Sequence, residues 1–205
     1  KGHELGNHSI FHPCRKREDF GWLADDYDLR RYTPRRWTDE MTMANAILSS
    51  LDGRDWRSFG NNCCNTEIGE GDSLQSLEPL IEDLFVAGRG PLNSQVVEVS
   101  NLNLNALGHF SGDAESFEST RAQLDAAVAA GGWIIYMIHG VGEGTHGLNI
   151  DPGVHQNLVD YVVPASPDRY FQFDIPLGDF LDLARRTDST CRVIAGPDSY
   201  RATPS

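Results

Sequence analysis

The chain has 205 residues, of which 30 are acidic and 17 basic, for a net charge of −13. This excess of negative charge disfavours nucleic acids, anionic lipids and polyanionic polymers as partners, and it suits a neutral polymer or a small neutral ester better. No apolar run reaches the roughly 18 residues that a membrane-spanning helix needs, so we expect no membrane partner.

Two histidines stand four residues apart near the start of the chain. His8 and His12 follow a strand-like segment, residues 1–7, and precede Pro13. On a helical turn this spacing places both imidazoles on one face, where they can share a metal ion. The alternative is a pair of unrelated polar histidines in a loop. The polar and aromatic segment 14–32 then predicts a long surface loop, a kind that is usually functional or mobile.

The next elements are predicted from capping residues and apolar spacing. Thr33 and Pro34 open a helix that ends at Asp52-Gly53. A short strand over 57–60 runs into the Gly/Asn-rich turn 61–71. We then expect a helix over 74–84, interrupted by Pro79, and a buried strand over 85–87 with a glycine exit at 88–90.

The second half of the chain continues the alternation. Asp113 or Ser116 caps a helix that Gly131 ends, and the apolar run 133–138 predicts a strand buried on both faces, ending in His139. Residues 101–110 look irregular, and His109 is given a structural role. The remaining expected elements are a helix from Pro152, a strand over 169–173, a helix over 177–184 and a small strand over 191–194.

Alternating strands and helices predict a parallel sheet with helices outside, either open or closed into a barrel. We expect one domain over 1–188 and a tail over 189–205 with room for one added strand. Ligands of such folds bind at the carboxyl ends of the strands. Since His8, the 61–71 turn and His139 all follow strand-like segments, the sequence predicts an active site that they share on one rim.

The four cysteines are Cys14, Cys63, Cys64 and Cys191. Adjacent Cys63 and Cys64 cannot close an ordinary loop with each other, and two bridges, one bridge or none are all compatible with the spacing. The compartment therefore stays open, with a lean toward secretion or the periplasm.

The residues 2–13, with both histidines and His12-Pro13, resemble the second motif of the polysaccharide deacetylase (NodB-homology) family, carbohydrate esterase family four. The strand from Trp133 to His139 resembles the family's last motif, and Phe59 to Gly71 is similar to its third. The resemblance covers nearly all of residues 1–186. It implies a distorted, incomplete (β/α) barrel that lacks its first strand.

The resemblance also implies roles for individual residues. His8 and His12 would bind a divalent metal, usually Zn²⁺, and His139 would be catalytic. Phe59, Asn61, Asn62 and Trp133 would line the substrate side. The implied reaction is hydrolysis of an acetyl group on a poly- or oligosaccharide, with an O-acetyl ester favoured over an N-acetyl amide. Four aromatic residues are candidates for stacking on sugar rings, or for ordinary packing: Trp22, Tyr27, Tyr32 and Trp56.

Some family features have no counterpart in the sequence. The Thr-Phe-Asp-Asp motif, which supplies the general base and a third metal ligand, does not occur in this chain. The candidates for a substitute carboxylate are Asp19, Asp25, Asp26 and Asp198. Positions 61–64 read Asn-Asn-Cys-Cys instead of the family's pattern, and Arg57 is the arginine nearest to the third motif.

Three hypotheses follow. The first is a metal-dependent deacetylase or acetyl esterase whose aspartate comes from elsewhere. The second is a carbohydrate-binding module that has lost catalysis. The third is an interaction module, because a barrel without its first strand has unpaired sheet edges through which we expect a homodimer.

Overall fold

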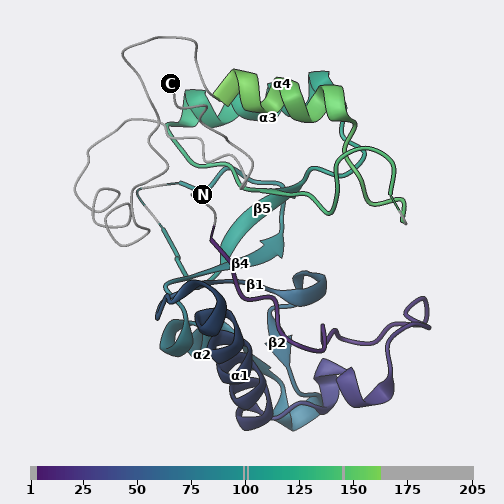
Figure 1. Cartoon of the computed structure of the whole chain (residues 1–205), viewed down its shortest axis with the longest axis vertical. Coiled ribbons are helices and arrows are strands. Elements are labelled where there is room, and N and C mark those ends of the chain that lie inside the picture. The colour runs from purple at the N-terminus through teal and green to yellow at the C-terminus, as the bar shows by residue number, and fades with distance from the viewer. Residues whose placement is uncertain (1–3, 99, 101, 145, 163–205) are drawn as a thin grey trace. The chain divides into compact units, whose positions relative to one another are not determined.

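The structure is a computed structural model that describes residues 4–98, 100, 102–144 and 146–162, with side chains up to residue 158 (Figure 1). The described residues form two compact units. The first contains Glu4–Pro91 and Asn103–Leu107, and the second contains residues 92–102 and those from Gly108 onward. The elements expected at 169–173, 177–184 and 191–194, and the tail 189–205, lie outside the described residues.

Helix α1, Pro34–Asp52, is the longest element of the first unit. It begins where the sequence predicts, because the Thr33 hydroxyl accepts a hydrogen bond from the Arg36 N–H, 3.2 Å away. It ends at Gly53, whose φ of 71° lies in the left-handed region that glycine adopts readily. Trp37 and Met41 point from its inner face into the core, as predicted.

The first unit also holds a parallel pair of strands, β1 (Ser58–Gly60) and β4 (Ala87–Leu92). Helix α2, Glu78–Leu84, starts later than predicted, and Pro79 lies in its first turn and does not split it. Strands β2 (Glu67–Ile68) and β3 (Gln75–Ser76) pair antiparallel. Four short 3₁₀ helices complete the unit: η1 (Asp25–Tyr27), η2 (Leu29–Arg31), η3 (Asn62–Cys64) and η4 (Gly71–Ser73).

Strand β4 corrects the prediction of a glycine exit at 88–90. Gly88 and Gly90 both lie inside the strand, where neighbouring atoms leave little room for a side chain. A Cβ atom on Gly88 would lie 2.8 Å from Ile81 Cγ2 and 2.9 Å from the Asn105 carbonyl oxygen, and one on Gly90 would lie 3.0 Å from Ala106 Cα. The glycines therefore permit a close approach of neighbouring chain segments to the strand.

The second unit contains strands β5 (Leu107–Ser111) and β6 (Tyr136–Met137), which also pair in parallel. Strand β5 corrects part of the prediction that residues 101–110 are irregular, since residues 107–110 belong to the strand, and it buries His109 completely. Helix α3, Phe117–Ala130, is capped by Ser116 and not by Asp113, and it ends at Gly131. Helix α4, Pro152–Val162, lies beside α3 (Figure 1).

Each unit has its own apolar core. Leu29, Trp37, Met41, Phe59 and Ile81 belong to the core of the first unit. Phe110, Leu124, Ile134, Ile150 and Leu158 belong to that of the second. The described chain is thus a mixed α/β protein whose units each contain parallel strands, as predicted.

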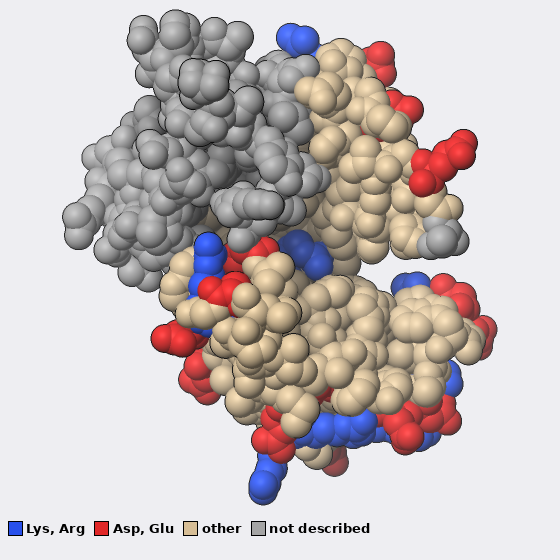
Figure 2. Space-filling view, viewed as in Figure 1, with Lys and Arg blue, Asp and Glu red and all other residues tan. Residues whose placement is uncertain are grey.

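The charged side chains are scattered over the surface. On the face drawn in Figure 2, acidic residues are interspersed with basic ones and form no single large patch. Among the described residues, no helix has the length and apolar character needed to cross a bilayer.

The close packing around β4 gives a testable prediction. Gly88→Ala adds a methyl group where a backbone oxygen and a core side chain already stand, so we expect the free energy of unfolding to fall by about 1–3 kcal/mol. Gly21→Ala is the matched control, since no atom lies within 4 Å of its added Cβ. Chemical denaturation of both variants checks this, and equal stability would contradict the packing argument.

Candidate functional site

His8 and His12 come together in the first unit, but not on a helical turn. Residues 8–12 form a tight loop in which Ser9 and His12 adopt left-handed φ values of 69° and 52°. The Ser9 hydroxyl accepts a hydrogen bond from the His12 N–H at 2.9 Å and closes the loop. The two imidazole centroids lie 5.0 Å apart, and the rings meet edge to face. The predicted proximity is therefore present, although the predicted helical turn is wrong.

Buried polar groups fix this loop to helix α1. The Asn7 amide donates to the Met41 carbonyl oxygen at 3.1 Å and to Asn45 Oδ1 at 2.7 Å. The buried Glu40 carboxylate accepts the backbone N–H groups of Ile10 and Phe11 at 3.2 and 3.1 Å. The loop is thus held by hydrogen bonds to a regular element that is itself packed in the core.

Tyr32 is a further hydrogen-bond donor to Glu40, and we call this set of hydrogen bonds the Glu40 anchor. Its hydroxyl donates to the second oxygen of Glu40 at 2.9 Å. Burial and the nearby Glu40 charge raise the pKa of the Tyr32 phenol, so it remains a hydrogen-bond donor at all physiological pH values. The Glu40 carboxylate therefore accepts three hydrogen bonds from buried or partly buried donors.

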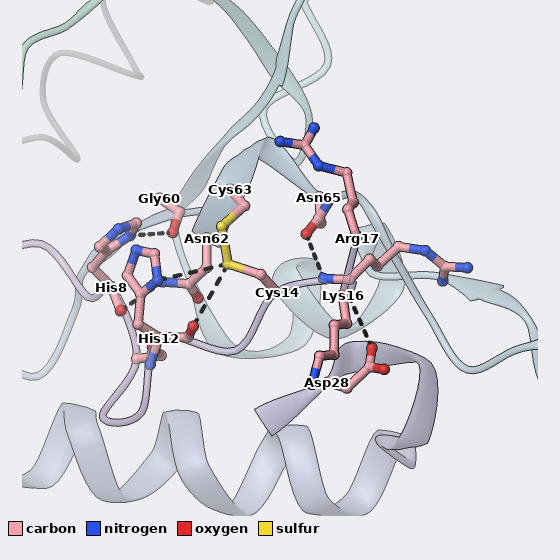
Figure 3. The surroundings of a disulfide bond; sticks show 12 residues. His8, His12, Cys14, Lys16, Arg17, Asp28, Gly60, Asn62, Cys63 and Asn65 are labelled. Carbon is pink, nitrogen blue, oxygen red and sulfur yellow. Dashed lines mark hydrogen bonds between the residues drawn. A yellow bond between two sulfur atoms is a disulfide. The ribbon is translucent and has the colours of Figure 1, made fainter. Parts of the chain in front are cut away.

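His8 is oriented by a backbone carbonyl. Its Nδ1 atom lies 2.7 Å from the Gly60 carbonyl oxygen, and the Asn62 amide donates to the His8 carbonyl oxygen at 2.9 Å (Figure 3). Since a carbonyl oxygen can only accept, Nδ1 carries the proton, and in the neutral ring Nε2 carries the lone pair. Metal-binding histidines commonly have this arrangement, in which the second ring nitrogen donates to a carbonyl or carboxylate.

A half-buried arginine, Arg89, lies near His8. A Cβ atom on Gly60 would be 2.9 Å from Nη2 of Arg89 and 3.3 Å from Nδ1 of His8, so a larger residue would require the guanidinium to move. Desolvation lowers the pKa of Arg89, and the electrostatic interaction and the hydrogen bond with Cys64 oppose that effect. Since an arginine stays charged in proteins, the guanidinium places a fixed positive charge next to His8.

A disulfide bond joins Cys14 to Cys63 on the other side of His12. Nδ1 of His12 lies 3.6 Å from the Cys14 sulfur, and Figure 3 shows the His12 ring facing the bridge. The donor atoms of His12, Cys14 and Cys63 all lie within 4.8 Å of one another, a spacing that can hold a metal ion. Because the two sulfurs are bonded to each other, only His12 offers a donor in the oxidised chain.

The segment that carries Cys14 has further anchors. The Arg15 N–H donates to Asn65 Oδ1 at 2.8 Å, and the Arg15 guanidinium donates to the Gly69 carbonyl oxygen at 2.9 Å. The Lys16 N–H donates to the Asp28 carboxylate. Burial alone would raise the pKa of Asp28, but hydrogen bonds from Arg30 and the backbone outweigh burial and hold this pKa at about 2.

Aromatic rings surround the histidine loop. Phe11 stacks on Tyr27 with centroids 4.9 Å apart, and the Trp22 ring lies 5.9 Å from that of His12. Trp22 is 60% exposed, whereas Tyr32 is buried in the core. Trp22 and Phe11 thus offer exposed ring surface next to His12, but Tyr32 does not.

His139 belongs to the second unit, where it pairs with an aspartate that the sequence did not single out for this role. Nδ1 of His139 lies 2.5 Å from one oxygen of Asp113, and the other oxygen accepts the His139 backbone N–H at 3.1 Å. The Asp113 side chain is 7% exposed and that of His139 is 40% exposed. Asp113 follows β5 and His139 follows β6, so the parallel pairing brings the two residues to one edge.

The four predicted substrate-binding residues are all in the interior. The Phe59 ring packs between Trp37 and Phe85, Asn61 and Asn62 are buried, and Trp133 is buried in the second unit. Their contact with a substrate stays a prediction, which this burial does not favour. The Asn61 amide has no hydrogen-bond partner among the described residues.

The other candidate residues have structural partners. Arg57 is buried and pairs with Asp52 at 2.6 Å, so it supports the fold. Asp19 pairs with Arg17 and Asp25 with Lys16 at the surface, while Asp198 lies outside the described residues. Within the described chain, His12, Cys14 and Cys63 are the only group of three metal-capable side chains at ligand spacing, and no carboxylate belongs to it.

Comparison with known proteins adds no identification. No family model, no curated protein and no solved structure matches this chain.

The Glu40 anchor gives a second testable prediction. Glu40→Ala leaves three donors without their acceptor, so we expect the free energy of unfolding to fall by about 2–4 kcal/mol. The control is Asp39→Ala on the same helix, where an exposed carboxylate 3.7 Å from Arg35 contributes little. Denaturant titration measures both. A Glu40→Ala variant as stable as Asp39→Ala would show that the anchor is not needed.

Proposed function

We propose that the chain is a metal-dependent hydrolase that removes acetyl groups from a carbohydrate, with an O-acetyl ester preferred to an N-acetyl amide. The observation that carries the proposal is the His8–His12 pair. The two imidazoles face each other at a centroid distance of 5.0 Å, and the Gly60 carbonyl sets the tautomer of His8 so that Nε2 can act as a ligand.

These residues fit a divalent metal, with Zn²⁺ the first candidate, because neutral imidazole nitrogens are its common ligands. His8 and His12 would hold the ion, together with a third ligand that is not assigned. When bound, such an ion supplies Lewis-acid activation of the acyl carbonyl and of the attacking water. The fixed charge of Arg89 beside His8 favours a developing negative charge near this loop.

Within the second unit, His139 and Asp113 form a pair suited to proton transfer, the role that the family resemblance gives to His139. Asp113 accepts the Nδ1–H of His139, which directs Nε2 away from the carboxylate. In the protonated ring, the Nε2–H can donate a proton, and the carboxylate stabilises the imidazolium charge. Asp113 is therefore a positioning residue for His139, to which the family resemblance gives the role of general acid.

The surface supports a neutral sugar as the substrate class. A net charge of −13 repels polyanions, and the exposed rings of Trp22 and Phe11 beside the histidine loop suit stacking on sugar rings.

The Cys14–Cys63 bridge is compatible with an oxidising compartment, in agreement with a secreted or periplasmic location. A carbohydrate-binding module without catalysis is the alternative, and activity measurements separate the two.

Metal binding is the first test. With the Cys14–Cys63 bridge kept oxidised, we expect the wild-type chain to bind one zinc ion and His8→Ala to bind it at least about 10- to 100-fold more weakly. Inductively coupled plasma mass spectrometry after dialysis measures the zinc. His155→Ala, a helix histidine in the other unit, is the control. Equal zinc content in wild type and His8→Ala would refute the site.

Acetate release is the second test, with acetylated xylan, chito-oligomers and aryl acetates as substrates. We expect Asp113→Asn to lower kcat by about 10²–10⁴-fold, since an amide does not stabilise the imidazolium, and to displace the pH profile of kcat. His139→Ala should be at least as impaired. Asp125→Asn on α3, an exposed residue paired with Arg121, is the control. Zinc binding without acetate release from any substrate would favour the binding module.

A further inference from the structure

The Cys14–Cys63 bridge closes on the same histidine that the proposed hydrolase uses. Cys14 is fully buried, Cys63 is partly buried, and His12 is exposed, so small molecules can approach the cluster from the His12 side. Each of the three side chains contributes a donor of the kind that zinc prefers, once the two sulfurs are thiolates.

The distances already suit a tetrahedral zinc ion. With Zn–S near 2.3 Å and Zn–N near 2.0 Å, the sulfur and nitrogen ligands of a tetrahedral site lie about 3.6 Å apart. The observed separation between the Cys14 sulfur and Nδ1 of His12 is 3.6 Å. All three donor atoms lie within 4.8 Å of one another. Only the two sulfurs must separate, and breaking the bond between them allows this.

The two cysteines stay near each other without the bridge. The Arg15 N–H and guanidinium bind Asn65 and the Gly69 carbonyl, and the Asn62 amide binds the His8 carbonyl. These contacts join the segments on both sides of the bridge, residues 8–15 and 62–69. The reduced cluster is therefore already organised for a ligand.

We propose that the Cys14–Cys63 bridge is the redox switch of a zinc site formed by Cys14, Cys63 and His12. A dithiol reductant supplies two electrons and two protons: its own sulfurs become a disulfide, and the Cys14–Cys63 bond breaks to give two thiols. Zinc binding then releases both protons and leaves a fourth position for water. In the reverse direction, a small-molecule disulfide accepts two electrons and is split into two thiolates, while Cys14 and Cys63 form the bridge; this removes two of the three ligands and releases the ion. This inference does not depend on the proposed hydrolase activity.

The test compares zinc affinity in oxidised and reduced protein. Reduction with a water-soluble phosphine, which takes an oxygen atom from water and becomes a phosphine oxide, opens the bridge without adding a competing thiol. We expect the reduced wild type to bind one zinc ion at least about 100-fold more tightly than the oxidised chain, measured by competition with a chelating dye. Cobalt substitution should give the intense visible bands of a tetrahedral site with thiolate ligands.

Variants assign the ligands. Cys14→Ser, Cys63→Ser and His12→Ala should each lose the reduced site, and His12→Ala retains both cysteines, which controls for loss of the bridge. The double variant Cys64→Ser/Cys191→Ser is the matched control and should keep it. His8→Ala should keep the reduced cysteine site and lose the ion of the proposed hydrolase. Cys14→Ser/Cys63→Ser should lose the reduced cysteine site and keep the hydrolase ion. The two proposals can therefore fail separately.

Three results would overturn the inference. They are no zinc uptake on reduction, equal affinity in reduced wild type and Cys14→Ser/Cys63→Ser, and loss of binding only in Cys64→Ser/Cys191→Ser. Circular dichroism of each reduced variant shows whether the fold persists. If Cys14→Ser/Cys63→Ser unfolds, the His12→Ala comparison decides.

Discussion

The buried carboxylate of Glu40 holds the loop that carries both histidines. It accepts hydrogen bonds from two consecutive backbone N–H groups of the loop and from Tyr32, and Asn7 adds a second connection to helix α1. The left-handed conformations of Ser9 and His12 are strained and persist only where the surrounding structure holds them. Its geometry therefore comes from α1, whose position is set by apolar packing. The site depends on buried polar bonds that a regular helix makes to an irregular segment.

Much of the fold could be predicted because its signals are local. Thr33-Pro34 and Gly53 define α1, Ser116 and Gly131 define α3, and both units contain the parallel pairing that the alternation of elements predicts. The errors in the predicted fold occur where tertiary packing, and not the local sequence, decides the structure. Glycine normally weakens a strand, yet Gly88 is inside β4 because a neighbouring segment leaves no room for a side chain. Strand β5 likewise could not be predicted from local signals, because its sequence does not alternate between apolar and polar residues.

The candidate site, too, could be predicted from the sequence only in part. The meeting of His8 and His12 could be inferred from their spacing, but not the left-handed turn that produces it. Asp113 could have been found once β5 was recognised, because it and His139 follow neighbouring parallel strands. Arg89 and Glu40 could not, since their relation to the loop arises only from tertiary packing. Phe59 and Asn61 are the opposite case. They lie close to the site in sequence, but their side chains are buried in the interior.

Gly60 limits how this chain can diverge. A side chain at this position would require the Arg89 guanidinium to move and the His8 ring to shift slightly, so changes at the three positions are coupled. We therefore expect glycine to be favoured here in a distant homologue that keeps both neighbours, even where the surrounding Asn and Cys residues differ. This coupling offers a criterion for finding homologues that overall sequence similarity would miss: a histidine pair near the start, a glycine ending the first parallel strand, and an arginine opposite it on the next.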